Sequence, residues 1–252
     1  VMRRGEVVET GTVENIYSAP KADYTRMLLA AVPRIDGERA QTLAPPDTGP
    51  PILDVDDVRV SFPVKIKDGS FFGKTKPLRA VDGVSFKLHA GETLGVVGES
   101  GCGKSTLARA VVQLLPRNAG KVTFLGRNLL PSEKEAIRKS RQDLQIVFQD
   151  PLASLDPRMT LGASIAEPLL SFEPLLNRAG REERVKEIML QVGLDPDLIN
   201  RYPHELSGGQ NQRVGVARAM ILKPKLVVCD EAVSALDVSI QAQILKLLID
   251  LQ

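Results

Sequence analysis

Residues 98–106 read GESGCGKST, which fits the pattern G-x-x-x-x-G-K-[ST] of a phosphate-binding loop. Its glycines permit backbone conformations that aim successive N–H groups at phosphate oxygens, and the helix expected from about Lys104 adds its positive end. Lys104 supplies a mobile charge for the β- and γ-phosphates, and the Ser105 hydroxyl is positioned to ligate Mg²⁺. The loop predicts nucleotide binding, but alone it does not separate kinases, GTPases and transport ATPases.

Two carboxylates follow an apolar run in the segment KLVVCDE, residues 225–231. The run is typical of a buried strand. Asp230 stands at its end and can hold Mg²⁺ through water, whereas Glu231 points elsewhere and can polarise an attacking water. The same sequence pattern would also arise from a strand followed by a solvated acidic turn without a catalytic role. Together with the phosphate loop, the pair favours hydrolytic chemistry.

A third motif, LSGGQ at residues 206–210, lies between these two and opens a segment with apolar residues at helical spacing. Ser207 is a good N-cap, and paired glycines let a backbone approach a ligand closely. The motif therefore offers a second helix N-terminus to an anion. Standing alone, it would be an ordinary capped helix after a glycine turn.

The elements that must position these motifs alternate between strands and helices. Apolar strand-like runs occur at 94–97, 144–148 and 226–229, and helix-like periodicity occurs at 107–115 and 185–192. This order indicates an α/β fold with a mainly parallel sheet covered on both faces. Further β-like runs precede it, at residues 52–62 and 80–88.

Composition bounds the class of protein. The chain has 252 residues, of which 43% are hydrophobic and 25% charged, and this excludes global disorder, a collagen-like fibre and a small disulfide scaffold. The net charge of +2 gives no electrostatic case for nucleic acid, so no such partner is expected. No run approaches the roughly 20 apolar residues of a spanning helix, no signal peptide is seen, and two cysteines fit a reducing compartment.

The ordered set of motifs resembles the nucleotide-binding domain of ATP-binding-cassette transporters, over about residues 52–252. The matching residues are GESGCGKST (98–106), the glutamine of VFQDP (Gln149), LSGGQ (206–210), LVVCDE (226–231) and SALD (234–237). The resemblance implies an α/β P-loop NTPase with a RecA-like core and mainly parallel sheet. It also implies an antiparallel β subdomain, and a helical subdomain at about residues 150–206.

Within that family, two cassettes form a head-to-tail dimer around two ATP molecules. The resemblance therefore implies ATP and Mg²⁺ as cofactors, catalytic roles for Glu231 and Gln149, and metal contacts from Ser105, Gln149 and Asp230. It implies nucleotide contacts, within the chain or across the dimer, for Phe62, Glu99, Ser100, Gly101, Cys102, Gly103, Lys104, Ser105, Thr106, Ser207, Gly208, Gly209, Gln210 and Asp237. Phe62 matches the aromatic that stacks on adenine, with Phe71 and Phe72 nearby and a core role as the alternative.

The segments around these motifs resemble the peptide-import branch of the family, which takes up dipeptides, oligopeptides or glutathione. The first residues are similar to the segment with which ATP subunits of that branch end. We expect a tail of a preceding cassette at 1–38, a proline-rich linker at 39–51 and a C-terminally truncated cassette at 52–252, as in a fused tandem-cassette protein.

Three features depart from the family pattern. The switch histidine would lie beyond Gln252, and neither histidine of the chain, His89 or His204, is in its place. Ala232 replaces the usual proline after the catalytic glutamate. Asn211 follows LSGGQ where Gln or a basic residue is common, so we expect an altered contact with the partner cassette.

These observations leave two function hypotheses and one variant. The first is an ATP-hydrolysing importer subunit, peripheral on the cytoplasmic face of the inner membrane. Its partners would be a second cassette, in tandem or as a homodimer, transmembrane permease subunits and, indirectly, a solute-binding protein. The second is a soluble ABC-type ATPase clamp that acts in DNA repair or translation. The variant is an ATP-binding module without hydrolysis. A GTPase is disfavoured, because the chain has no N-K-x-D motif.

Overall fold

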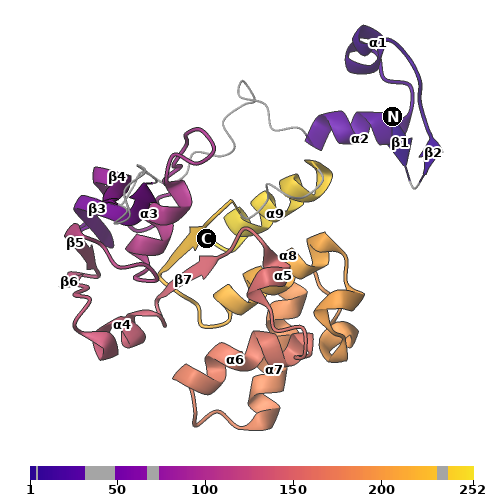
Figure 1. Cartoon of the computed structure of the whole chain (residues 1–252). Coiled ribbons are helices and arrows are strands. Elements are labelled where there is room, and N and C mark those ends of the chain that lie inside the picture. Colours follow the sequence, from indigo (N-terminus) through magenta and orange to yellow (C-terminus); the bar gives the residue numbers. More distant parts are fainter. Residues whose placement is uncertain (4, 32–48, 67–73, 232–237) are drawn as a thin grey trace. The chain divides into compact units, whose positions relative to one another are not determined.

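The computed structural model of the chain describes residues 1–3, 5–31, 49–66, 74–231 and 238–252 (Figure 1). These residues form two compact units, and each is described by itself. One unit contains residues 1–31 and 238–252, and the other contains residues 49–231. Residues 39–48 of the linker predicted at 39–51, the segment 234–237, Ala232, Phe71 and Phe72 lie outside the described residues. The predicted domain boundaries therefore stay predictions.

The smaller unit is a strand pair with three helices. Strands β1 (Met2–Arg3) and β2 (Glu6–Val7) are antiparallel, and helix α2 (Asp23–Ala31) packs against α9 (Val238–Asp250). Helix α1 (Val13–Ser18) begins at Thr12, whose side chain accepts a hydrogen bond from the Asn15 amide. Such a cap satisfies an amide that has no partner within the helix.

Glu9 fixes the start of α2. Its carboxylate accepts hydrogen bonds from the amides of Lys21 and Ala22, at 2.8 and 3.0 Å, and from the buried hydroxyl of Thr25. A carboxylate at this end of a helix also interacts favourably with the helix dipole. The hydrogen bond from the Thr25 hydroxyl, followed by those from the two amides, lowers the pKa of Glu9 from 4.5 to about 2.

The larger unit begins with an antiparallel sheet in the order β4-β3-β5-β6. Strand β3 (Leu53–Ile66) pairs along its length with β4 (Lys74–Leu88) and also with β5 (Ala119–Phe124), which in turn pairs with β6 (Arg127–Asn128). Alternate residues of these strands turn one apolar face into the core, as the pleat requires. The buried residues that they contribute include Leu53, Val55, Val58, Val60, Val81, Leu88, Val122 and Phe124.

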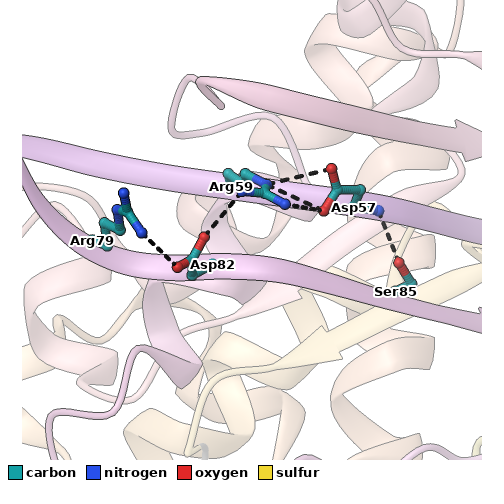
Figure 2. Close-up of polar contacts among 5 residues, drawn as sticks. All are labelled: Asp57, Arg59, Arg79, Asp82 and Ser85. Carbon is teal, nitrogen blue, oxygen red and sulfur yellow. Dashed lines mark hydrogen bonds and ion pairs between the residues drawn. The ribbon is translucent and has the colours of Figure 1, made fainter.

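A bulge interrupts β3 at Asp57, where the register with both neighbours shifts. Asp57 has a positive φ of 45°, and its amide donates to the Ser85 hydroxyl at 2.8 Å (Figure 2). Arg59 donates to the Asp57 carboxylate at 2.9 Å and to Asp82 at 3.4 Å, and Arg79 also reaches Asp82. These exposed ion pairs add little stability each, so their main effect is to satisfy the polar groups of the bulge.

The second sheet of this unit is parallel. Strands β7 (Leu144–Val147) and β8 (Leu226–Cys229) pair in register from Leu144 opposite Leu226 to Val147 opposite Cys229. Helix α3 (Lys104–Val111) packs against β3 and β4, and the short α4 (Lys134–Ser140) precedes β7. The parallel pair and the antiparallel sheet thus meet around one apolar core.

The segment between β7 and β8 is helical. Its elements are α5 (Pro151–Ser154), α6 (Leu161–Phe172), α7 (Arg178–Gln191), the 3₁₀ helices η1 (Pro196–Asn200) and η2 (Pro203–Glu205), and α8 (Gly208–Met220). Helix α6 packs against both α7 and α8, and α8 also contacts β7 (Figure 1). None of the helices in the described ranges is both long and apolar enough to cross a membrane.

One predicted strand is not formed. The apolar run Leu94–Val97 has no regular secondary structure, and Val97 is 93% exposed. Among the described residues the parallel sheet consists of β7 and β8, and no described strand offers residues 94–97 a hydrogen-bond ladder. An apolar run becomes a strand only when a neighbour pairs with its backbone, so its composition alone was an insufficient guide.

The charge on Glu9 makes the smaller unit sensitive to acid. Because folding lowers its pKa, Glu9 contributes stability above about pH 4.5, and this stability is lost as the pH falls toward 2. We expect Glu9→Gln to lower the thermal unfolding midpoint of this unit at pH 6 but to have little effect near pH 2. Circular dichroism melts of both proteins across this range would measure the difference.

A direct titration gives the control for Glu9. In carbon-detected NMR, the Glu9 carboxyl should titrate near pH 2 in the wild type and at clearly higher pH in Thr25→Val, which removes the hydroxyl donor. Thr25→Ser keeps that donor and should titrate like the wild type. Equal titration of all three proteins would contradict the assigned cause.

The bulge in β3 predicts a glycine requirement at position 120. Gly120 has φ +87°, and a Cβ there would lie 2.3 Å from the Asp57 carbonyl oxygen. Gly120→Ala should therefore destabilise the larger unit by about 1–3 kcal/mol through strain and overpacking. Gly126→Ala is the matched control, because Gly126 has φ +76° but open space around it. Chemical denaturation should show the larger loss for position 120, and equal losses would refute the backbone contact as its cause.

Candidate functional site

The parallel pair β7–β8 brings two predicted catalytic side chains to one edge. Both strands point the same way and are in register, so the residues that follow them emerge side by side. The Asp230 amide donates to the Val147 carbonyl at 2.9 Å and continues the ladder beyond β8. Gln149 follows β7 and Glu231 follows β8, and the Gln149 side-chain amide donates to the Glu231 carboxylate at 2.9 Å.

The backbone at Glu231 turns sharply. Its φ is +49°, in the left-handed region that costs a non-glycine residue about 1–2 kcal/mol. Such conformations persist where the surrounding structure imposes them, and they are frequent at functional sites. Asp230 is 3% exposed, whereas the adjacent Glu231 side chain is 38% exposed. The turn thus leaves one carboxylate buried and the next one accessible.

The phosphate loop brings Lys104 to the same edge. Its ammonium donates to the carbonyls of Gly98 and Glu99, both at 2.9 Å, and lies 3.6 Å from the Glu231 carboxylate. The Cys102 amide donates to Glu99 within the same loop. Lys104, Gln149 and Glu231 come from three separate parts of the sequence, so their contact is a product of the fold.

The backbone geometry explains why glycine occupies two positions of the phosphate loop. Gly103 is the N-cap of α3 with φ +102°, and a Cβ there would lie 2.2 Å from the Ala80 carbonyl oxygen of β4. Gly101 has φ +79°. Glycine is therefore favoured at Gly101 by the backbone conformation alone, and at Gly103 by both the conformation and the close approach of β4. The antiparallel sheet thus sets the position of the loop through this contact with β4.

Asp230 has the properties of a metal-associated carboxylate. Its Oδ2 is buried and accepts no hydrogen bond from the residues that the structure describes, and it lies 3.5 Å from the guanidinium of Arg109 on α3. A buried anionic oxygen without a hydrogen bond is costly unless a cation compensates it. Mg²⁺ binds through one or two carboxylates, substrate phosphates and retained waters. Asp230 and the Ser105 hydroxyl at the start of α3 fit such a site.

The LSGGQ residues form a separate helix start. The Ser207 side chain accepts a hydrogen bond from the Gln210 amide, and the Gln210 side chain accepts one from the Ser207 amide. This reciprocal pair is a capping box, which was predicted in part by Ser207 as N-cap. The described contacts of both side chains stay within the start of α8. The structure thus brings Lys104, Gln149, Asp230 and Glu231 together, but not the LSGGQ residues with them.

Other predicted residues lie as follows. Phe62 is on β3 opposite Leu78 and is 38% exposed, so it is not a core residue. Ser100, Ser105 and Thr106 lie in the phosphate loop or the first turn of α3. Asp237 lies outside the described residues.

Asn211, for which the sequence predicted an altered contact with a partner cassette, is a buried residue. It is 1% exposed, and its side-chain amide donates to the carbonyl of Pro203 at 2.9 Å. The bond ties η2 to α8 and so helps to fix the turn that precedes Ser207. A side chain buried within its own chain cannot contact a partner directly.

Arg109 is a site residue that the motif pattern did not identify. One signal could have found it, because Ser105 and Arg109 are four residues apart on a helix and therefore share a face. An arginine on the same helix face as Ser105 can carry its charge toward the carboxylate that follows β8. The 3.5 Å contact with Asp230 shows this arrangement.

Comparison with known proteins places these motifs in a family. A sequence model described as "ABC transporter" matches residues 81–234, and a second, "Oligopeptide/dipeptide transporter, C-terminal region", matches residues 8–57. The first match spans the phosphate loop, Gln149, LSGGQ and the two carboxylates. The second covers the beginning of the chain.

Several curated proteins are similar in sequence. The oligopeptide transport ATP-binding protein OppF of Salmonella typhimurium is 58% identical over 201 residues, covering 80% of this chain and 60% of OppF. The glutathione import ATP-binding protein GsiA of Pectobacterium atrosepticum is 47% identical over the whole chain, which covers 43% of GsiA. The peptidoglycan transport ATP-binding protein YejF of Agrobacterium fabrum is 46% identical, and 45% of it is covered. The chain thus spans about half the length of these relatives.

Solved structures give the same result for the fold. A dimeric ATP-binding cassette bound to ADP and Pi, MJ0796, matches 78% of this chain and 81% of its own with a TM-score of 0.67 at 26% identity. The cassette cbiO1 of Clostridium perfringens, part of an ABC transporter complex, matches with a TM-score of 0.65 at 26% identity and covers 80% of this chain and 74% of its own. These matches confirm the predicted α/β P-loop NTPase fold. The chain belongs to the ABC transporter family.

Proposed function

We propose that the chain binds and hydrolyses ATP to energise the import of peptides or peptide-like solutes. The observation that carries this proposal is the contact of Lys104 with Glu231 and of Glu231 with Gln149, at 3.6 and 2.9 Å. A phosphate-binding cation, a general base and an amide that can orient water thereby share one place. These are the groups that phosphoryl transfer to water requires.

Each residue of this site has a role that its position supports. Lys104 and the loop amides would hold the β- and γ-phosphates, and the Glu231 carboxylate would accept a proton from the attacking water. The Gln149 amide, already bonded to Glu231, would orient that water. Mg²⁺ would neutralise charge on the phosphates, held by the Ser105 hydroxyl and, through water, by Asp230 and Gln149.

The adenine contact is proposed for Phe62. Its ring is partly exposed on β3, where Phe62 pairs with Leu78 of β4. The same strand pair reaches the phosphate loop, because Ala80 of β4 lies against Gly103. An aromatic ring on this sheet can therefore stack on a base whose phosphates occupy the loop.

A second cassette would complete the site. Ser207 is exposed at the start of a helix, and the described contacts of the Ser207–Gln210 motif stay within its own chain segment. A helix start of this kind suits the γ-phosphate of a nucleotide held by another cassette. The relative with ADP and Pi is a dimer, which supports this arrangement. Gly208, Gly209 and, across the interface, Asp237 belong to the same proposal.

The solute class and the remaining partners rest on the relatives. OppF, GsiA and YejF are named for transport of oligopeptides, glutathione and peptidoglycan, and these names favour import over a soluble clamp in DNA repair or translation. We infer permease subunits as membrane partners, a solute-binding protein as an indirect one, and a peripheral location on the cytoplasmic face of the inner membrane. The match of residues 8–57 to a transporter C-terminal region supports a tandem arrangement, with a preceding cassette that ends near residue 38.

Removal of the Lys104 charge tests nucleotide binding. A charge-assisted hydrogen bond contributes about 1.5–3 kcal/mol, so Lys104→Ala should weaken binding of Mg-ATP by about 10- to 100-fold. Isothermal titration calorimetry would measure the dissociation constant. Lys186→Ala removes an exposed lysine on α7 that pairs with Glu182, and it should bind like the wild type. Equal affinity in all three proteins would remove the loop from the proposal.

Neutralising Glu231 separates binding from hydrolysis. Because general-base catalysis contributes about 100- to 10,000-fold, Glu231→Gln should lower phosphate release by at least about 100-fold while ATP binding persists. In the full-length protein the variant should trap ATP between paired cassettes, which is measured as nucleotide that stays bound after desalting. Glu182→Gln, which removes an exposed carboxylate on α7 that pairs with Lys186, serves as the control. Hydrolysis by Glu231→Gln at the wild-type rate would overturn the role of this residue.

A further inference from the structure

Arg218 connects three helices with one side chain. It lies on α8, eleven residues after Ser207, which is about 16 Å along the helix axis. One guanidinium nitrogen donates to the Ser154 carbonyl of α5 at 2.7 Å, and another donates to the Glu167 carboxylate of α6 at 2.6 Å. The helix that begins with LSGGQ is therefore bonded to the segment that follows Gln149.

The surroundings make this polar contact important. A cavity of about 260 Å³ lies between β7, α5, α6 and α8, and its lining includes Ser154, Glu167 and Arg218. Close packing transmits displacement between helices, but a cavity interrupts it. Where packing is interrupted, directional hydrogen bonds hold the elements together. A planar guanidinium can bond two acceptors at once in fixed geometry, which an ammonium cannot reproduce.

The contact with Ser154 also reaches the predicted catalytic edge. Asp150, directly after Gln149, caps α5 by accepting the Ala153 amide at 3.1 Å. Pro151 opens this helix, and the Ser154 hydroxyl donates to the Pro151 carbonyl at 2.8 Å. The four residues of α5 thus form one stiff turn. A shift of the Ser154 carbonyl therefore displaces the backbone that carries Gln149.

We propose that Arg218 is a positioning residue that keeps the turn after Gln149 in register with the LSGGQ helix. Through this link, movement of α8 changes where the Gln149 amide meets Glu231. The inference rests on the proposed ATP hydrolysis only for its catalytic consequence. The physical link itself concerns the placement of residues 149–155.

The chain contains a matched control for this role. Arg184 on α7 also joins a carboxylate and a backbone carbonyl: it donates to Glu173 at 3.2 Å and to the Ile221 carbonyl at 2.9 Å. The two arginines are similarly exposed, at 32% for Arg218 and 29% for Arg184. Arg184 does not bond to α5. Arg218→Met and Arg184→Met therefore remove the same kinds of bonds with different expected effects on Gln149.

The experiment compares these variants in the full-length protein. For Arg218→Met we expect kcat for ATP to fall about 10- to 100-fold, as misplacement of a catalytic group allows, with KM for ATP within about 2-fold of the wild type. Arg218→Lys, which keeps the charge and one bond, should recover part of kcat. Arg184→Met should keep both constants near wild type. Equal loss of kcat in both Met variants, or a change confined to KM, would overturn the proposal.

Hydrogen exchange gives a readout that does not depend on hydrolysis. Amides of residues 149–155 should exchange faster in Arg218→Met than in Arg184→Met, and Arg218→Lys should lie between the wild type and Arg218→Met. Unchanged exchange in this segment would refute the link even if the protein hydrolyses ATP. Absence of hydrolysis in the wild type, together with faster exchange in Arg218→Met, would refute the proposed function and support the link.

Discussion

The in-register pairing of β7 with β8 is the constraint on which the candidate site depends. Two parallel strands that end at the same level deliver the residues after them to a common edge. Gln149 and Glu231 need no further device to meet, because each follows its strand by two residues. The phosphate loop then has to bring only one positive charge to that edge. Its position is set by the close approach of Gly103 to Ala80 on the antiparallel sheet.

The charges at this edge form two pairs of opposite sign. Lys104 faces Glu231 and the carbonyls of its own loop, and Arg109 faces the buried Asp230. Both cations belong to α3, and both anions directly follow β8. A triphosphate brought to the loop would take over bonds of the Lys104 ammonium from the loop carbonyls. The ammonium would also move away from Glu231. Because the Lys104–Glu231 pair is partly exposed, loss of this ion pair costs at most about 1 kcal/mol, which a bound phosphate readily compensates.

The sequence predicted which residues meet at the candidate site better than it predicted each strand that surrounds them. The phosphate loop and the carboxylates have local signatures, and the structure brings Lys104, Asp230, Glu231 and Gln149 to one edge as the motif order implied. The run Leu94–Val97 had the composition of a strand but has no regular structure, because strand formation depends on a pairing neighbour that no local pattern encodes. The fold class itself was predicted correctly from the alternation of strands and helices.

Local sequence patterns could not predict contacts between residues far apart in the chain, for the same reason. The bond between Arg218 and the Ser154 carbonyl joins residues 64 apart, and neither has a distinctive neighbourhood in sequence. Asn211 illustrates the same limit. Its position after LSGGQ predicted an altered contact with a partner cassette, but not that its side chain is buried and bonded to the Pro203 carbonyl. Burial, not proximity to a motif, decides what such a residue can touch.

The left-handed backbone at Glu231 limits how this protein can be made more robust. The described residues contain five non-glycine residues with positive φ, and glycine would relieve local strain at each of them. At Lys223 or Gln113, replacement by glycine would relieve backbone strain and would remove only side-chain contacts. At Glu231 it would remove the carboxylate that meets both Lys104 and Gln149. Under the proposed mechanism, relief of backbone strain and turnover are therefore opposed at this one residue.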